Sequence, residues 1–259
     1  MTKKMVLFDI DGTLLDHEKK LPASAKESIR SLKEIGHEVA IATGRPPYFF
    51  KELREELEID TFVCFNGQYV VVENEVIYKN PVDKEKLARL LNFSSPQEHP
   101  LVFMGVESMK ASIDYHPNIE ESFANLDEGI IYPKLNANYF NETEIYQAML
   151  YCEEHEEAFY RNNVQDLNFI RWHKYAMDVL PFGGSKAQGI EKLIEKKGFT
   201  KDQAYAFGDY YNDVEMLQYV GHGIAMGNAP ADVKKVARHV TKNVDDNGIA
   251  YGLEMVGLL

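Results

Sequence analysis

The chain has 259 residues, of which 45% are hydrophobic and 27% are charged. This length and composition suit a globular protein with a real hydrophobic core, and they exclude disordered, collagen-like and coiled-coil classes. Asp and Glu number 41 against 28 Lys and Arg, and the net charge of −13 disfavours nucleic acids and anionic membranes as partners. An anionic small substrate requires local positive charge from a metal ion, a lysine or helix N-termini.

The sequence shows no targeting or membrane-spanning pattern. The apolar run that begins at Met5 is interrupted at Asp9, which makes it too short for the hydrophobic region of a signal peptide. No run approaches the ~18 apolar residues of a membrane span. Cys64 and Cys152 lie far apart and outside any metal-binding spacing, so we expect both to be reduced. We therefore expect a cytoplasmic protein.

The start of the chain predicts a strand, a helix and a second strand. Met5–Ile10 is a short apolar stretch typical of a strand covered on both faces in a parallel sheet. Apolar residues then recur at helical spacing over Ala25–Ile35, with Pro22 before them and Gly36 after them. A second apolar strand follows at Val39–Ala42. Such a unit predicts a parallel sheet flanked by helices.

The remaining elements predict that this pattern is interrupted and then resumes. A strand at Phe62–Phe65 precedes a hairpin formed by Tyr69–Val72 and Val76–Tyr78. After an intervening stretch of mixed short elements come a helix through Ala187 and Ile194, a strand at Ala204–Phe207, a helix at Val214–Val220 and a strand at Gly223–Met226. We therefore predict an α/β fold: a doubly wound parallel-sheet core of residues 1–81 and 183–259, with an α/β domain of residues 82–182 inserted.

Polar residues follow the predicted core strands, at the edge where open parallel sheets bind ligands. Asp9 and Asp11 are two carboxylates close enough to repel each other unless a cation is bound, and hard oxygen ligands on a turn suit Mg²⁺. Thr43-Gly44-Arg45 offers a hydroxyl and backbone N–H groups to an oxyanion. Taken alone, each group is more often a turn or a cap.

Two further groups lie nearer the C-terminus. Gly208–Asp213 places Asp209 at a strand end and Asp213 at a helix start, a pattern that by itself also fits an N-cap at Asn212 or Asp213. Lys186 lies in the first turn of a helix, where the helix dipole disfavours a cation unless a phosphate is its partner. The residues before Lys186 lack the spacing of a P-loop.

Together and in this order, the four groups resemble the motifs of the haloacid dehalogenase superfamily. The matching stretches are Asp9-x-Asp11-Gly-Thr, Thr43-Gly-Arg, Lys186 and Gly208-Asp209-x-x-Asn212-Asp213. The size and place of the insertion, with Asn66-Gly67 and residues 223–229, are similar to the Cof-type phosphatases of subclass IIB. The resemblance covers both core segments, whereas the insertion matches in size and place only. It implies a Rossmann-like core with an α/β cap domain that selects the substrate.

The resemblance implies a Mg²⁺-dependent phosphatase that forms an aspartyl-phosphate. Asp9 would be the nucleophile and Asp11 the general acid and base. The metal would be held by Asp9, Asp209 and the backbone carbonyl of Asp11, with Asp213 supporting the site. The phosphoryl oxygens would be held by the Ile10 N–H, Thr43, Gly44, Lys186 and Asn212. Mg²⁺ and Lys186 would supply the positive charge that a chain of net charge −13 requires at such a site.

Three alternatives remain beside this phosphatase. A phosphomutase would pass the phosphoryl group to a sugar hydroxyl, and the phosphatases of sucrose and trehalose synthesis have the same class of cap. A catalytically silent binding protein would be marked by loss of Asp9 or Asp11, and both are present. Dehalogenases lack an acid at the second position, so Asp11 disfavours that reaction. We expect a small phosphorylated metabolite as substrate, such as a sugar phosphate, pyridoxal phosphate or flavin mononucleotide, and a monomer or homodimer.

The residues that would select the substrate stay open. The candidates in the cap are Tyr115, His116, Arg171, Trp172 and His173. Lone aromatic residues and histidines are more often structural than functional. The acidic run Glu153–Glu157 surrounds His155, and we interpret it as a solvated helix face rather than a metal site.

Overall fold

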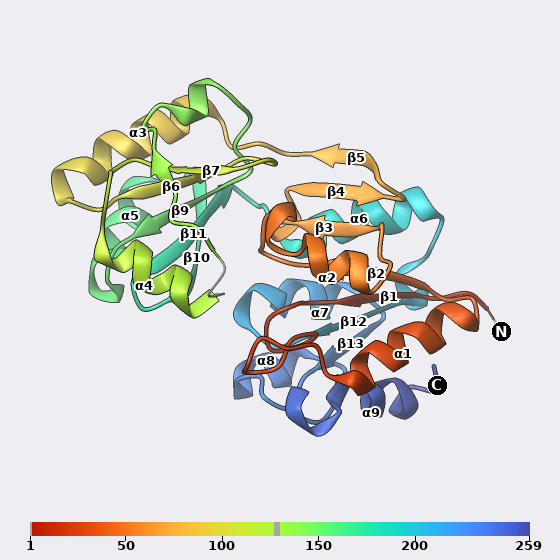
Figure 1. Ribbon diagram of the computed structural model, residues 1–259. Coiled ribbons are helices and arrows are strands. Elements are labelled where there is room, and N and C mark those ends of the chain that lie inside the picture. The colour runs from red at the N-terminus through yellow and green to blue at the C-terminus, as the bar shows by residue number, and fades with distance from the viewer. Residues whose placement is uncertain (1, 127–129) are drawn as a thin grey trace. The chain divides into compact units, whose positions relative to one another are not determined.

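The computed structural model describes residues 2–126 and 130–259, and the chain divides into two compact units (Figure 1). The first unit runs to Arg45 and also includes residues 50–78 and 185–259. The second unit consists of residues 46–49 and 79–184. Residues 46–49 therefore pack with the second unit although both flanking segments belong to the first. Within the described ranges, no helix combines the length and the apolar character that crossing a bilayer requires.

The first unit is built on an eight-stranded sheet with the order β14-β13-β12-β1-β2-β3-β4-β5. Its strands are β1 (Met5–Phe8), β2 (Glu38–Ala42), β3 (Phe62–Cys64), β4 (Tyr69–Val72), β5 (Glu75–Lys79), β12 (Ala204–Gly208), β13 (His222–Ala225) and β14 (His239–Val240). The six strands from β14 to β3 are parallel, and β4 runs antiparallel to β3. Strand β1 pairs with both β2 and β12, so the two ends of the chain form one sheet (Figure 1).

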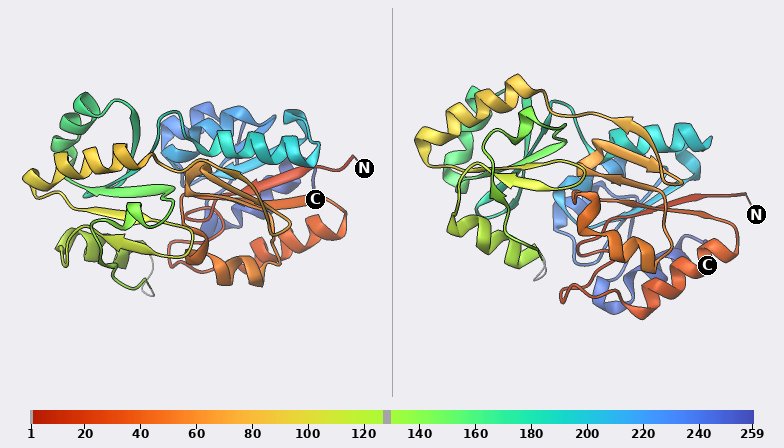
Figure 2. Two further views of the ribbon diagram at one scale, coloured as in Figure 1. Left: turned by 90° about the horizontal axis from the view of Figure 1, so that it is seen from above. Right: turned by 45° about the horizontal axis from the view of Figure 1, so that its top comes forward.

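Helices cover both faces of this sheet. They are α1 (Ala23–Glu34), α2 (Lys51–Glu56), α6 (Lys186–Lys197), α7 (Val214–Tyr219), α8 (Ala231–Val236) and α9 (Gly248–Met255). On one face, Ile190 and Leu193 of α6 and Met216 of α7 pack with Met5 and Leu7 of β1. Figure 2 shows α1 on the opposite side of the sheet from α6, and α9 contacts α1. Burial on both faces explains why the central strands are apolar throughout.

The second unit contains a six-stranded sheet with the order β10-β11-β9-β6-β7-β8. Its elements are α3 (Lys84–Ser94), β6 (Leu101–Met104), β7 (Met109–Ala111), α4 (Pro117–Leu126), β8 (Lys134–Leu135), β9 (Gln147–Tyr151), α5 (Glu157–Asn163), β10 (Leu167–His173) and β11 (Ala176–Pro181). All of its strand pairs are antiparallel except β7 with β8. Leu87 and Leu90 of α3 and Tyr160 of α5 pack on one sheet face, against alternate residues such as Leu101 and Phe103.

The predicted fold class is confirmed: the core is a doubly wound, mainly parallel sheet, and a second α/β unit interrupts it. Strand β1 ends at Phe8, one residue before Asp9, so the carboxylates lie in the loop and not in the strand. One interpretation is wrong in part. Glu153 and Glu154 are exposed, but Glu157 opens α5 with only 17% of its side chain exposed, because Arg171 and Arg161 pair with it.

Candidate active site

The candidate site lies in the first unit, at the carboxyl ends of three neighbouring strands. Asp9 follows β1, Thr43 follows β2 and Asp209 follows β12. The backbone N–H of Asp9 donates to the Phe207 carbonyl at 3.0 Å, which extends the pairing of β1 with β12 by one residue. Because parallel strands end at one edge, residues separated by up to 200 positions meet here.

Lys186 is the buried cation of the site. It begins α6, its side chain is 0% exposed, and its Nζ donates to Asp9 Oδ1 at 2.6 Å and to Asp213 Oδ1 at 2.7 Å. Burial by itself would lower the pKa of Lys186, but the charges of Asp213 and Asp9 raise it above its ordinary value. Lys186 is therefore charged and binds two carboxylates at once.

Three carboxylates converge around this lysine. Asp9, Asp209 and Asp213 each place one oxygen within 4.8 Å of the other two, and this is the one such group among the described residues. Burial, followed by the charge of Asp213, raises the pKa of Asp9, and the same causes raise the pKa of Asp209 to about 7. One ammonium group cannot neutralise three carboxylates. This donor set of hard oxygens with excess negative charge fits a divalent cation such as Mg²⁺.

Asp213 also fixes the end of β12. Its Oδ2 accepts the backbone N–H groups of Asp209 at 2.9 Å and Tyr210 at 3.1 Å, while its Oδ1 accepts from Lys186. A Cβ on Gly208 would lie 2.6 Å from the Asp213 carboxyl carbon, so only glycine fits there. Both oxygens of Asp213 are thus engaged by protein donors, which suits a supporting role.

Asp11 is held by two cations. Arg45 donates from Nε to Oδ2 at 2.8 Å and from Nη2 to Oδ1 at 2.7 Å, and Lys19 donates to Oδ1 at 2.8 Å. Burial would raise the pKa of Asp11, but the hydrogen bonds and charges of Arg45 and Lys19 lower it to about 2. The sequence places Arg45 in the Thr43-Gly-Arg motif without indicating a contact with Asp11, and it has no signal for Lys19.

The loop that carries Asp11 packs directly against Asp209. Gly12 has a φ of 72°, and a Cβ there would lie 2.3 Å from Asp209 Oδ2, so a larger residue would displace that carboxylate. The carbonyl of Ile10 accepts from the N–H groups of Thr13 and Leu15, which closes the turn. Asn228 Nδ2 donates to the Gly12 carbonyl at 2.9 Å and to Asp209 Oδ2 at 3.1 Å.

Asn228 was missed as a site residue, although the stretch that contains it resembled the Cof-type pattern. The signal that could have found it is its place just after a core strand, since β13 ends at Ala225 on the same sheet edge. A carboxamide at that edge can donate to a neighbouring carboxylate. A polar residue just after a core strand can therefore indicate a site residue even outside the four motifs.

The predicted phosphate-binding residues surround the same edge. Thr43 is buried, and its Oγ1 accepts the Arg45 N–H at 3.0 Å. Asn212 Nδ2 donates to Asn66 Oδ1 at 3.1 Å, and the Asn66 side chain also lies against Gly44. Sequence reasoning had not assigned Asn66 to the site. The structure thus brings Asp9, Asp209, Asp213 and Lys186 together in one cluster and connects Gly44 and Asn212 through Asn66.

Among the described residues of the second unit, four of the five candidate selectors have local hydrogen-bond partners, and Trp172 is the exception. Tyr115 donates to Glu120 and stacks on Tyr132, whose hydroxyl accepts the backbone N–H of His116. His173 accepts the N–H of Tyr175. The indole N–H of Trp172 is buried without a hydrogen-bond partner among the described residues.

Arg171 is the most fully engaged of these candidates. It donates to Glu157 Oε2 at 2.7 Å and to the carbonyls of Cys152, His173 and Lys174 at 3.1 to 3.2 Å. Only 18% of its side chain is exposed. Its guanidinium thus joins the ends of several chain segments within the second unit.

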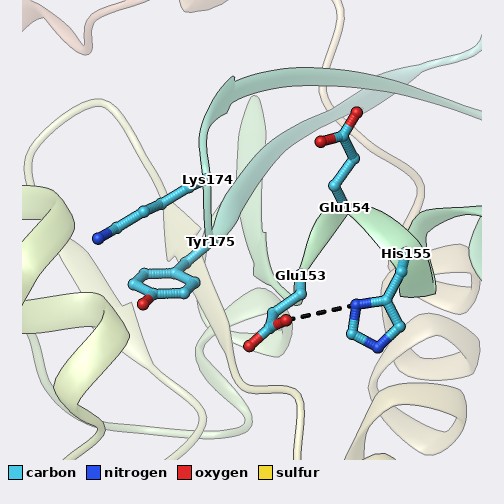
Figure 3. Close-up of a pocket in the computed structure, with 5 residues that line it drawn as sticks. All are labelled: Glu153, Glu154, His155, Lys174 and Tyr175. Carbon is cyan, nitrogen blue, oxygen red and sulfur yellow. Dashed lines mark ion pairs between the residues drawn. The ribbon is translucent and has the colours of Figure 1, made fainter.

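A surface pocket in the second unit involves the acidic run. It is lined by Glu153, Glu154, His155, Lys174 and Tyr175. In Figure 3 the Glu153 carboxylate faces the His155 ring, 3.3 Å away, whereas Glu154 and Lys174 point in other directions. Lys174 pairs with Glu121 at 2.6 Å. These groups do not converge on one point, unlike the carboxylates of the first unit.

Comparison with known proteins matches this chain to a family. The family model of haloacid dehalogenase-like hydrolases matches residues 6–253. "Putative phosphatase YkrA" of Bacillus subtilis (strain 168) is 44% identical over 259 residues, which is 100% of both chains. A hypothetical protein from Geobacillus kaustophilus HTA426 has a crystal structure with a TM-score of 0.91 and 51% identity, over 99% of this chain and 100% of that one. The subclass IIB sugar phosphatase BT4131 has a TM-score of 0.91 and 29% identity, over 99% and 100% of the two chains.

Proposed function

The chain belongs to the haloacid dehalogenase-like hydrolase family, and from this premise we propose that it hydrolyses small phosphate monoesters with the help of Mg²⁺ and through a phosphorylated aspartate. That it is a hydrolase of phosphate monoesters follows from its family and its phosphatase relatives. The observation that carries the finer proposal is the buried Lys186, bonded to Asp9 and Asp213 inside a group of three carboxylates.

In this proposal Asp9 is the nucleophile. A bond would form between an Asp9 oxygen and phosphorus while the ester P–O bond breaks, and water would then cleave the acyl phosphate to release inorganic phosphate. Lys186 offsets the negative charge of Asp9 and keeps its carboxylate in one orientation through a 2.6 Å hydrogen bond. Its burial strengthens this interaction because little water screens it.

Asp11 is the residue that would move protons. One third of its side chain is exposed, so it can reach a bound ester. Arg45 and Lys19 hold it as a carboxylate, which is the form that accepts a proton from the attacking water. For the first step Asp11 would have to be protonated, which in this proposal requires that ester binding displace Arg45 and Lys19 from its carboxyl group. The proton that Asp11 gives to the leaving oxygen would then be regained from the attacking water.

The metal would be held by Asp9, Asp209 and the Asp11 carbonyl, with Asp213 supporting them through its hydrogen bonds to the backbone. When bound, the cation would offset the negative charge that three carboxylates present to an incoming phosphate. The phosphoryl oxygens would be held by the Ile10 N–H, Thr43, Gly44, Lys186 and Asn212. Each of these residues lies at the same sheet edge as the carboxylates or follows it in the next turn.

The test is release of phosphate from p-nitrophenyl phosphate by the purified chain, with Mg²⁺ and with EDTA. We expect release that requires Mg²⁺ and disappears in Asp9→Asn. Asp232→Asn is the matched control, because Asp232 lies on α8 with 74% of its side chain exposed. Equal release in EDTA would contradict the metal requirement, and an active Asp9→Asn variant would exclude the phosphorylated aspartate.

We propose sugar phosphates as the first substrates to examine, followed by pyridoxal phosphate and flavin mononucleotide. The support is the likeness over the full chain to a structure described as a sugar phosphatase. The measurement is kcat/KM across a panel of such esters, because discrimination depends on binding of the transition state. A chain that transfers the phosphoryl group to a second sugar and releases no phosphate would instead be a mutase.

A further inference from the structure

The turn Phe65–Gly67, which follows β3, contacts three of the segments proposed to surround the phosphoryl group. The Asn66 N–H donates to the Thr43 carbonyl at 3.0 Å. The Asn66 Oδ1 accepts from Asn212 Nδ2 at 3.1 Å. Gly67 lies against the start of α6, since a Cβ there would be 1.9 Å from the Ser185 carbonyl oxygen, next to Lys186. The turn therefore connects segments that are far apart in the sequence.

The backbone of this turn adopts a conformation that non-glycine residues rarely take. Phe65, Asn66 and Gly67 have φ values of 50°, 51° and 97°. Two consecutive non-glycine residues in the left-handed region are costly, although asparagine tolerates the region better than most residues. The Gln68 side chain donates to the Asn66 carbonyl at 2.9 Å and helps to hold the turn. Strain of this kind concentrates at functional sites, where surrounding contacts maintain it.

The Asn66 side chain is completely buried between two proposed phosphate-binding residues. A Cβ on Gly44 would lie 3.0 Å from both Asn66 Oδ1 and Nδ2, so the carboxamide lies flat against the Gly44 backbone. The Asn212 amide has two N–H bonds, and Asn66 Oδ1 accepts one of them. That hydrogen bond determines which way the remaining N–H of Asn212 points.

We propose that Asn66 is a positioning residue of the phosphatase: it orients the Asn212 carboxamide toward the phosphoryl oxygens and maintains the Thr43-Gly44 turn. It acts through Asn212, because its Oδ1 accepts from Asn212 Nδ2 at 3.1 Å and its carboxamide lies against Gly44. The inference rests on the proposed function. Asn66 lies outside the four motifs, and its effect on the reaction would pass through its hydrogen bond with Asn212.

A double-mutant cycle on phosphate release separates this role from a structural one. Asn66→Gly removes the carboxamide and keeps the left-handed backbone, because glycine adopts positive φ freely. We expect Asn66→Gly and Asn212→Ala each to lower kcat/KM about tenfold, which is the effect of losing one buried hydrogen bond. The double variant should be no worse than Asn212→Ala within about twofold, because the two residues would act as one unit.

Asn74→Gly is the matched control. Asn74 has a φ of 64° in the turn between β4 and β5, so the same replacement is made at a left-handed asparagine away from the carboxylates. It should keep the wild-type kcat/KM. A second readout is inhibition by orthovanadate, an anion that resembles the phosphoryl group, which should weaken in Asn66→Gly and not in Asn74→Gly.

Two results would overturn the inference while leaving the proposed function standing. One is a wild-type kcat/KM in Asn66→Gly, and the other is a double variant whose loss equals the product of the two single losses. If the wild-type chain releases no phosphate from any ester and does not bind orthovanadate, the proposed function itself fails. Circular dichroism and urea unfolding of every variant check that lost activity does not come from lost folding.

Discussion

Lys186 in the first unit and Arg171 in the second are both cations at the centre of a polar cluster, but the two clusters differ in charge. Lys186 bonds two carboxylates, Asp9 and Asp213, and a third, Asp209, lies beside them. Arg171 bonds a single carboxylate, Glu157, and its other hydrogen bonds go to backbone carbonyls and to Cys152 Sγ. The first cluster therefore has excess negative charge, and the second has none.

This difference in charge suits a functional site at Lys186 and a structural cluster at Arg171. Burial and the charge of Asp213 raise the pKa values of Asp9 and Asp209, so bringing these carboxylates together costs folding free energy, as is common at sites of chemistry or metal binding. The Arg171 cluster instead satisfies carbonyls at the ends of several segments and lowers the pKa of Glu157. We therefore expect Lys186 to matter first for activity and Arg171 first for stability.

The largest effect is expected for Lys186→Met. Without the ammonium group, Asp9 and Asp213 lose their shared donor, and we expect kcat/KM to fall by about 10³-fold or more, as for loss of a key electrostatic group. The measurement is phosphate release at saturating Mg²⁺. Lys192→Met, on the same helix with 39% of its side chain exposed, is the control and should keep full activity. Loss below tenfold would mean that Lys186 is a structural cation like Arg171.

The second largest effect is expected from Mg²⁺ binding to the excess negative charge of the Lys186 cluster. Because Mg²⁺ binds only the folded cluster, it should stabilise the protein, by about 2.7 kcal/mol at a concentration 100 times its Kd. Urea unfolding with Mg²⁺ and with EDTA measures this difference. Asp209→Asn should abolish it by removing one of the three carboxylates. A Mg²⁺-induced gain that survives in this variant would place the cation elsewhere.

Arg171 is expected to contribute to stability and not to activity. Arg171→Met should lower the free energy of unfolding by about 2 kcal/mol, because it leaves Glu157 Oε2 and several carbonyls without the donor that Arg171 provides. The kcat/KM for each active ester should stay within about twofold of wild type. Arg89→Met is the control, since the Arg89 side chain is 45% exposed and pairs with Asp166. A change in substrate ranking with unchanged stability would make Arg171 a selector of substrate.

The two clusters also differ in how far the sequence reveals them. Lys186 could be predicted because four polar groups occur in a fixed order, each at a strand end or a helix start. The role of Arg171 depends on which of four neighbouring glutamates pairs with it. The sequence pattern does not show that Glu157 pairs with Arg171 while Glu153 pairs with His155. Asn66-Gly67 resembles the Cof-type pattern, but the sequence does not indicate what Asn66 contacts, because its partner Asn212 lies 146 positions away along the chain. Order along the chain thus predicts that Lys186 and the carboxylates meet, while the other side-chain contacts between distant segments could not be predicted.

The smallest effect is a pH dependence of stability that comes from Glu157. Burial would raise the pKa of Glu157, but hydrogen bonds from Arg171 and Arg161 lower it below the ordinary value of 4.5. A carboxyl group whose pKa is lower in the folded state stabilises the fold above its unfolded pKa, and this contribution is lost as pH falls through the folded value. Wild type should therefore exceed Glu157→Gln in unfolding free energy at pH 6, and the gap should narrow as the pH falls below 4.5.

Glu153→Gln is the control for this titration, because 58% of the Glu153 side chain is exposed and a glutamine can still accept the Glu156 N–H that Glu153 accepts. It should unfold like wild type at every pH. The difference in unfolding free energy between wild type and Glu157→Gln could instead stay constant from pH 6 to pH 3.5. That result would show that the glutamine destabilises the protein through packing and not through loss of charge. In that case, pairing of the Glu157 charge with the two arginines would not be what stabilises the Arg171 cluster.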